Sequence, residues 1–257
     1  MSRQNRRLWP FCVLLSAVTV ASAAPLGFQP AVTYPVGAAP FGVAVGDFDG
    51  DRALDLAIVN AGDGSVSILL DNGDGTFEAA MNFSACKNCN RIATADFNAD
   101  TKSDLVVLRP GDAAVSDDGD VTVFLSNGNG TFRKGQVLTT GRNPSFVLSQ
   151  DINADHRPDL IVSNQSDDTV AVLLGNGDGS FQSPVPYTTG AQRTSTSLSL
   201  VDFDQDGLQD LAVAGISGTD ILLANGDGTF RTGPSLTTGV FFRIVAWADF
   251  NQDGKID

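Results

Sequence analysis

The sequence predicts an all-β fold made of repeated four-stranded antiparallel units, and three observations carry this prediction. A loop with the pattern Asp-x-[Asp/Asn]-x-Asp-x-x-x-Asp occurs five times, and an Asn-Gly turn follows four of these loops. Two short apolar runs lie between each of these loops and its turn. Because four antiparallel strands in about fifty residues form one propeller blade, we expect a β-propeller with four complete blades and partial terminal strands.

The Asp/Asn loops set the period of the repeat. They begin at Asp47, Asp96, Asp151, Asp202 and Asp249, in steps of 49, 55, 51 and 47 residues. Repetition at such a period indicates a repeat architecture.

The Asn-Gly motif marks one tight turn in each repeat. It reads NGDGTF from Asn72 and Asn225, NGNGTF from Asn127 and NGDGSF from Asn176. Asn-Gly and Asp-Gly tolerate the positive φ of hairpin turns, and apolar alternating runs flank them. We expect a strand on each side of every turn.

The runs between loop and turn supply two strands of each blade. They read DLAIVN and SVSILL, DLVVLR and VTVFLS, DLIVSN and TVAVLL, and DLAVAG and TDILLA. Residues of these types favour strands. With one strand before each loop and one after each turn, the predicted blades cover about residues 40–90, 91–144, 145–194 and 195–241, and a partial blade covers 242–257.

The two ends of the chain carry partial blades. GFQPAVTYPVGA near the N-terminus matches SFQSPVPYTTGA, which aligns Tyr34 with Tyr187, so the chain opens with a fourth strand. The fifth loop stops at Asp257, before the next strands of its blade. An N-terminal strand can complete the final blade of a propeller and hide exposed edges. We expect a truncated portion of a larger propeller; a four-blade ring with ragged ends is the alternative.

Residues 1–24 are typical of a signal peptide. Three arginines precede the apolar run 8–20, and small residues follow it. The run is shorter than the ~20 residues of a membrane span, so we expect cleavage after Ala23 or Ala24 and no transmembrane span in the mature chain. A retained N-terminal anchor is the alternative. Residues 25–257 would then form a secreted or cell-surface propeller.

The chain is strongly acidic. Its formal charge of −14 becomes −17 without the three arginines of the leader, and 17 of its 30 acidic residues occupy the five loops. This charge argues against nucleic acid as a partner. The fixed placement of the acids implies divalent cations as their counter-charge.

Positions 1, 3, 5 and 9 of each loop offer carboxylate or amide oxygens that can converge on one hard cation. The carbonyl of position 7 and water would complete the shell. Ligands of oxygen alone favour Ca²⁺, because zinc prefers nitrogen or sulfur and magnesium requires tighter octahedral geometry. The predicted calcium ligands are Asp47, Asp49, Asp51, Asp55, Asp96, Asn98, Asp100, Asp104, Asp151, Asn153, Asp155, Asp159, Asp202, Asp204, Asp206, Asp210, Asp249, Asn251, Asp253 and Asp257.

The EF-hand shares the first part of this spacing but requires Glu at position 12 and a helix on each side. Position 12 here is Ile58, Val107, Val162 or Val213, within predicted strands. We therefore reject the EF-hand interpretation.

Position 6 distinguishes the loops from one another. Glycine eases a sharp turn there, and it is present as Gly207 and Gly254 but replaced by Arg52, Thr101 and His156. We expect the fourth loop to bind calcium best and the fifth, which lacks its blade, to bind weakly. Asx-rich turns without metal are the alternative for the first three.

Cys86 and Cys89 are the only cysteines left once Cys12 leaves with the leader. Export favours a disulfide between them. A zinc site would need further thiols or imidazoles, and His156 is the only histidine.

These residues resemble the FG-GAP/VCBS repeats of integrin-α-like β-propellers. PFGVAVGDFDGDRALDLAIVN and VLLGNGDGSF are similar to the blade signatures of that family. The resemblance covers about residues 26–257. It implies calcium at the matched Asp and Asn positions, in loops between the first two strands of each blade. The functions of the family range over adhesion, sugar binding and domains appended to enzymes.

We expect a non-catalytic binding or adhesion module for a protein or carbohydrate ligand. A lectin-like propeller and a non-catalytic part of a larger polysaccharide-active enzyme are the alternatives. Catalysis is disfavoured because His156 belongs to a metal loop, so no Ser-His-Asp arrangement can be built. Carboxylates that hold calcium would also stay ionised and could not act as general acids.

Overall fold

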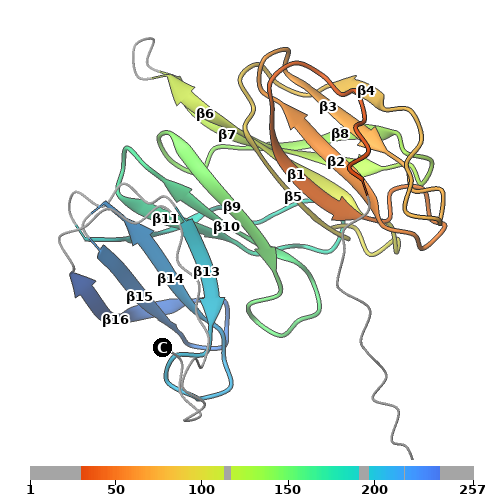
Figure 1. Ribbon diagram of the computed structural model, residues 1–257. Coiled ribbons are helices and arrows are strands. Elements are labelled where there is room, and N and C mark those ends of the chain that lie inside the picture. The colour runs from red at the N-terminus through yellow and green to blue at the C-terminus, as the bar shows by residue number, and fades with distance from the viewer. Residues whose placement is uncertain (1–29, 113–116, 191–196, 217, 238–257) are drawn as a thin grey trace, which may run out of the picture. The chain divides into compact units, whose positions relative to one another are not determined.

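The computed structural model describes residues 30–112, 117–190, 197–216 and 218–237 (Figure 1). The predicted signal peptide, the partial blade 242–257 and the fifth loop lie outside these residues. The ligands predicted in that loop, Asp249, Asn251, Asp253 and Asp257, are therefore not described further. The described strands all belong to the unit that begins at Tyr34.

The described residues form sixteen strands in four antiparallel sheets of four strands each, and they contain no helix. This architecture confirms the predicted all-β fold of four-stranded blades. The described residues therefore include no helix that could span a membrane. The sheets comprise β1 (Pro40–Gly46), β2 (Asp55–Asn60), β3 (Ser65–Leu69) and β4 (Met81–Ser84); β5 (Arg91–Ala95), β6 (Asp104–Asp112), β7 (Asp117–Ser126) and β8 (Phe132–Leu138); β9 (Pro144–Gln150), β10 (Asp159–Asn164), β11 (Thr169–Leu173) and β12 (Val185–Thr188); and β13 (Ser197–Val201), β14 (Asp210–Gly215), β15 (Gly218–Ala224) and β16 (Phe230–Thr237).

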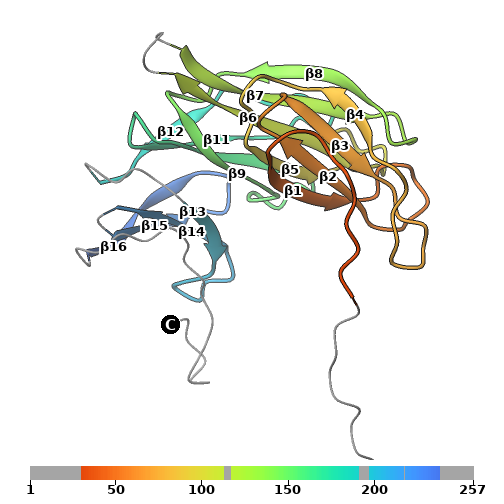
Figure 2. The same ribbon diagram turned by 45° about the horizontal axis from the view of Figure 1, so that its top comes forward.

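Strand order within every sheet follows the chain, as expected for propeller blades (Figure 2). The first strands of successive sheets are neighbours: β1 lies beside β5, β5 beside β9, and β9 beside β13. We refer to the four sheets as blades 1 to 4 in chain order.

The second strands of blades 2, 3 and 4 are buried on both faces, which explains their continuous apolar sequences, whereas alternate residues of β2 in blade 1 are only half-buried. On β6, Leu105 and Val107 belong to the core cluster shared with blade 1. Val106 and Leu108 belong to the cluster shared with blade 3. Strands covered on both sides read as unbroken apolar runs, whereas half-exposed strands alternate. A third cluster joins blades 3 and 4 in the same way.

The fourth strand is continuous in blades 2 and 4 but interrupted in blades 1 and 3. In blade 1 the residue after the turn, Phe77, forms an isolated bridge with Asp71 before β4 begins. Phe181 forms the same kind of bridge with Gly175 before β12. Blade 3 carries Pro184 at this gap, and proline has no N–H to donate to a sheet.

Phenylalanines connect the first two loops to the blades that follow them. Phe48, at position 2 of the first loop, packs edge-to-face on Phe132 of blade 2 with ring centroids 5.6 Å apart. Phe97 packs on Phe181 of blade 3 at 5.3 Å. Edge-to-face packing is a favoured aromatic geometry, worth about 0.5–1.5 kcal/mol beyond the buried area. These rings are core residues and do not form an exposed binding stripe.

The segment before β1 contacts blade 1 as the end of β12 contacts blade 4. The Tyr34 hydroxyl accepts a hydrogen bond from the Phe77 N–H at 3.1 Å, and that of Tyr187 accepts one from the Phe230 N–H at 3.2 Å. Both tyrosines also pack edge-to-face on these phenylalanines. The predicted alignment of Tyr34 with Tyr187 therefore corresponds to equivalent contacts in the fold. The predicted N-terminal strand is not formed in the described part of this segment, because residues 30–39 pair with no other strand.

Candidate functional site

The four described Asp/Asn loops lie between the first and second strands of their blades, and their backbones follow one plan. The carboxylate at position 1 accepts a hydrogen bond from the N–H of position 6, which folds the loop around it. The four bonds run from Arg52 to Asp47 (3.0 Å), Thr101 to Asp96 (2.8 Å), His156 to Asp151 (2.8 Å) and Gly207 to Asp202 (3.0 Å).

Position 6 is left-handed in every described loop. Its φ is 88° at Gly207 but also 74° at Arg52, 71° at Thr101 and 64° at His156. L-residues pay roughly 1–2 kcal/mol for this conformation, most of all a β-branched residue such as threonine. The first three loops therefore adopt the same turn as the fourth at a cost in backbone strain.

The carboxylate at position 9 is buried in all four loops, with an exposed fraction of 0–1%. One of its oxygens accepts the N–H of position 2, and the other accepts the N–H of the residue just before the Asn-Gly turn. These pairs of bonds measure 2.7 and 2.9 Å for Asp55, 3.0 and 2.7 Å for Asp104, 3.0 and 2.8 Å for Asp159, and 2.9 and 2.8 Å for Asp210. The carboxylate thus ties the loop to the turn.

Burial shifts the ionisation of these carboxylates. It raises the pKa of Asp104 to about 6, although hydrogen bonds from Ser126 and Phe97 act in the opposite direction. Burial likewise raises the pKa of Asp55 and Asp159. Nearby acids of the same loops add to the effect. A cation beside such a carboxylate would favour its ionised form.

The loops with Asp at position 3 gather three carboxylates each. Asp47, Asp49 and Asp55 offer oxygens that all lie within 4.8 Å of one another, and so do Asp202, Asp204 and Asp210. In the second and third loops position 3 is an asparagine. The amide oxygens of Asn98 and Asn153 accept the N–H of position 5 at 3.0 and 3.1 Å.

Position 5 stands apart from the two carboxylate groups. Asp51 and Asp206 lie outside them, and their oxygens accept the N–H of position 7 at 2.7 and 2.8 Å. Asp100 and Asp155 make the same contact in the second and third loops. Arg231 also pairs with Asp204 at 3.1 Å, and Lys102 with Asp100 at 3.5 Å. The donors in these loops are oxygens throughout, and this set fits Ca²⁺.

His156 lies at the surface of the third loop. Its side chain is 96% exposed, and its Nδ1 is 4.0 Å from an oxygen of Asp151. The imidazole therefore points to solvent, and it lies in ion-pair contact with Asp151 of its own loop.

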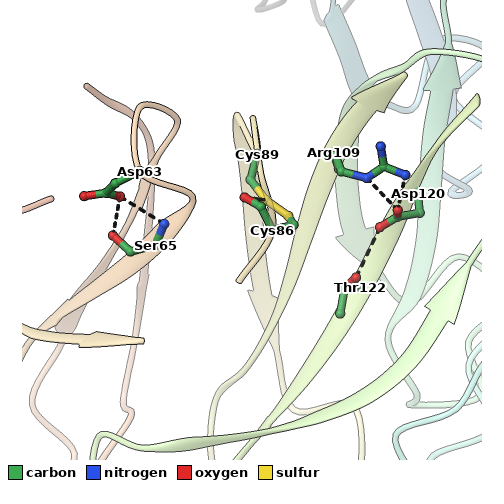
Figure 3. Close-up of a disulfide and its surroundings, with 7 residues drawn as sticks. All are labelled: Asp63, Ser65, Cys86, Cys89, Arg109, Asp120 and Thr122. Carbon is green, nitrogen blue, oxygen red and sulfur yellow. Dashed lines mark hydrogen bonds and ion pairs between the residues drawn. A yellow bond between two sulfur atoms is a disulfide. The ribbon is translucent and has the colours of Figure 1, made fainter. Parts of the chain in front are cut away.

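Cys86 and Cys89 form a disulfide in the segment between blades 1 and 2 (Figure 3). Their Cα atoms are 5.6 Å apart, and Cys89 is fully buried in the core cluster between these blades. The bond closes a short turn at the place where other blades carry a Thr-Thr-Gly sequence.

Sequence reasoning missed the backbone role of position 9. Its partners at the turn lie 14–22 residues further along the chain, so no local pattern reveals them. The available signal was that each of these aspartates opens a buried apolar strand, where a carboxylate needs partners.

Four blades of four antiparallel strands, each with the same loop between its first two strands, define a repeat β-propeller. The model of the FG-GAP-like repeat matches residues 47–107, 111–162, 151–213 and 202–257. The chain therefore belongs to the FG-GAP-like repeat family. No curated protein matches it.

Solved structures share the fold. An Agrocybe aegerita lectin, described as recognising non-reducing terminal N-acetylglucosamine, is 25% identical with a TM-score of 0.52, over 75% of this chain and 51% of the lectin. A protein from Lactobacillus plantarum is 14% identical with a TM-score of 0.57, over 84% of this chain and 60% of its own. The chain thus spans about half to three fifths of these structures.

Proposed function

We propose that this chain is a secreted, calcium-stabilised propeller that acts as a non-catalytic binding module. The observation that carries the calcium part is the gathering of Asp202, Asp204 and Asp210, whose oxygens lie within 4.8 Å of one another. Three carboxylates this close repel one another, and a divalent cation between them removes that repulsion.

Calcium has a mechanical consequence in this fold. In the first loop the Asp55 carboxylate already joins the loop to the Asn-Gly turn, and Phe48 joins the loop to blade 2. A cation that fixes positions 1, 3 and 9 therefore stiffens a contact between blades. A rigid set of blade loops suits a protein that presents a preformed surface to a partner.

Carbohydrate is the second candidate, and one observation favours it over a protein ligand. The lectin that shares 25% identity with this chain is described as binding a terminal sugar. Neither a lectin-like role nor an adhesive role requires catalytic residues.

A glycan array tests the binding role. The exported chain, residues 25–257, is probed in calcium and in EDTA, with Asp204→Ala to weaken the fourth loop and Asp71→Ala as a control outside it. We expect calcium-dependent capture of glycans by the parent chain and the control, and weaker capture by Asp204→Ala. Release of new reducing ends from a polysaccharide would contradict the non-catalytic role.

A further inference from the structure

Arg91 is a half-buried cation that no carboxylate of the described residues neutralises. Its Nη1 donates to the backbone carbonyl of Asn90 at 3.1 Å. Its guanidinium lies over the ring of Phe41, with Cζ 4.8 Å from the ring centroid, and the Phe146 ring is a second aromatic neighbour at 6.0 Å. Burial lowers the pKa of this guanidinium, which nevertheless stays protonated as arginine does in proteins.

The other six described arginines are either paired or exposed. Three form ion pairs with aspartates: Arg109, Arg142 and Arg231. Three lie exposed to solvent: Arg52, Arg133 and Arg157. A charge that is partly withdrawn from water needs a partner, and aromatic rings supply only part of what an anion would. Arg91 therefore differs from the rest in being ready to accept an anion.

The fold places Arg91 beside the first strands of two other blades. It opens β5, which lies next to β1 and β9 (Figure 1). The registers put it at the position of Gly42 in blade 1 and of Phe146 in blade 3. Among the residues of β1, β5, β9 and β13, Arg91 alone carries a charge. The first strands thus surround one cation with neutral residues.

This cation is distant from the Asp/Asn loops. Arg91 is the first residue of β5, whereas the second loop begins at Asp96, directly after the last residue of this strand. Because a strand rises about 3.3 Å per residue, the two backbone positions are roughly 16 Å apart. An anion at Arg91 would therefore not be a ligand of the predicted calcium sites.

We infer that Arg91 and Phe41 bind one uronic acid residue of a glycan. A guanidinium holds a carboxylate through two parallel hydrogen bonds, and apart from the bond to Asn90 the N–H groups of Arg91 have no hydrogen-bond partner among the described residues. Phe41 is 62% exposed, so its ring offers a surface to the C–H groups of a pyranose. A uronic acid carries its carboxylate directly on the pyranose ring, so one residue meets both groups.

Charge and shape select this ligand from other anions. The chain has a formal charge of −14, which repels a polyanion, whereas one guanidinium can hold one carboxylate at short range. An acidic peptide side chain would present a carboxylate without a rigid C–H face beside it. The inference rests on the proposed binding role, to which it adds a site and a class of ligand.

Titration calorimetry on residues 25–257 in calcium tests the inference. The ligands are D-glucuronate and D-galacturonate, with D-glucose, D-galactose and acetate for comparison. Each uronate differs from its neutral sugar at C6, and acetate offers a carboxylate without the ring. We expect at least one uronate to bind about tenfold or more tightly than its neutral sugar and than acetate, the equivalent of one charge-assisted hydrogen bond.

Four variants locate the binding. Arg91→Gln removes the charge and should weaken uronate binding about tenfold or more, and Arg91→Lys, which keeps the charge but not the paired donors, should recover part of it. Phe41→Leu should weaken uronate binding and leave acetate unchanged. Arg142→Gln is the matched control, because it also removes a guanidinium just before a first strand, and Asp167 already pairs with that one. Melting curves identify the variants that fold.

Three results would overturn the inference. Equal uronate binding by the parent and by folded Arg91→Gln would place the carboxylate elsewhere. Acetate that binds as tightly as the uronates would reject the sugar as the ligand, and no heat of binding with either uronate would reject the site. Glycan-array capture by both the parent and Arg91→Gln would still leave the proposed binding role intact, whereas an absence of capture by the parent would remove the carbohydrate role itself.

Discussion

The position 9 aspartates combine burial with ionisable chemistry. Each makes two backbone hydrogen bonds, yet burial still raises the pKa of Asp55, Asp104 and Asp159 above the usual value of 3.8. A raised folded-state pKa means that the folded protein binds this proton more tightly than the unfolded chain. Without metal, the stabilising contribution of Asp104 is present at low pH and is lost as pH rises from about 4 to about 6.

Calcium competes with that proton, which gives the first prediction. Metal binding requires ionised carboxylates, so the stabilisation by calcium should shrink as pH falls through about 6, the pKa of Asp104. Thermal melts with calcium and with EDTA at a series of pH values measure it. An equal calcium effect on both sides of this pKa would contradict the assignment.

Backbone strain at position 6 of the Asp/Asn loops gives the second prediction. Thr101 has φ 71°, and Thr101→Gly should stabilise the chain by about 0.5–1 kcal/mol, because the strain removed exceeds the entropy that glycine adds to the unfolded state. Denaturant unfolding in EDTA measures the change. Thr101→Ala, still left-handed but not β-branched, should recover only part of it, and a loss of stability in Thr101→Gly would show that the loop does not strain this residue.

At the scale of one blade, the position 9 carboxylate joins the loop to the turn. Asp104→Asn keeps the size of the side chain but replaces one acceptor with a donor that faces a backbone N–H. We expect a loss of about 1–3 kcal/mol even in EDTA, the cost of an unsatisfied buried group. Asp100→Asn, in the exposed part of the same loop, should cost less, and equal losses would argue against the tie between loop and turn.

The turn between blades 1 and 2 carries its own prediction. Because Cys86 and Cys89 form a disulfide, a chain of residues 25–257 should show no free thiol when it is denatured without reductant. Reduction should release two. Thiol titration measures both states, and free thiols before reduction would contradict the bond.

At the scale of the molecule, the sequence predicted the fold because the repeat is written into local patterns. The Asp/Asn loop, the apolar strand, the Asn-Gly turn and the phenylalanine after the turn recur together in each repeat. The sequence of each segment favours its own local conformation. The strand DLIVSN is confirmed as β10, with the same bounds, Asp159–Asn164. Interruption of the fourth strand in blades 1 and 3 was not predicted, although Pro184 marks the gap in blade 3.

The sequence predicted only part of the candidate site. Spacing indicated which residues could meet at one cation, and the structure brings positions 1, 3 and 9 together in the first and fourth loops. It could not show that position 9 is committed to backbone contacts, because these depend on how the strands pair.

One face of β1 distinguishes blade 1 from the later blades. Val43 is 60% exposed, whereas Val147 and Leu198, at the same register, are 5% and 4% exposed under the preceding blade. Val45, two residues along the same strand, is 48% exposed. This exposed face of β1 and the contacts of Tyr34 support the prediction of a larger propeller.

Calcium dependence of thermal stability tests the central claim most directly. Residues 25–257 are melted with excess EDTA and with increasing calcium, with magnesium as a control. One site at a hundredfold excess of calcium over its dissociation constant adds about 2.7 kcal/mol, or about 5–10 °C in a chain of this size. We predict a rise of at least this amount, reduced by Asp204→Ala and not by Asp71→Ala. An identical melting curve in calcium and in EDTA would contradict the assignment of these loops as calcium sites.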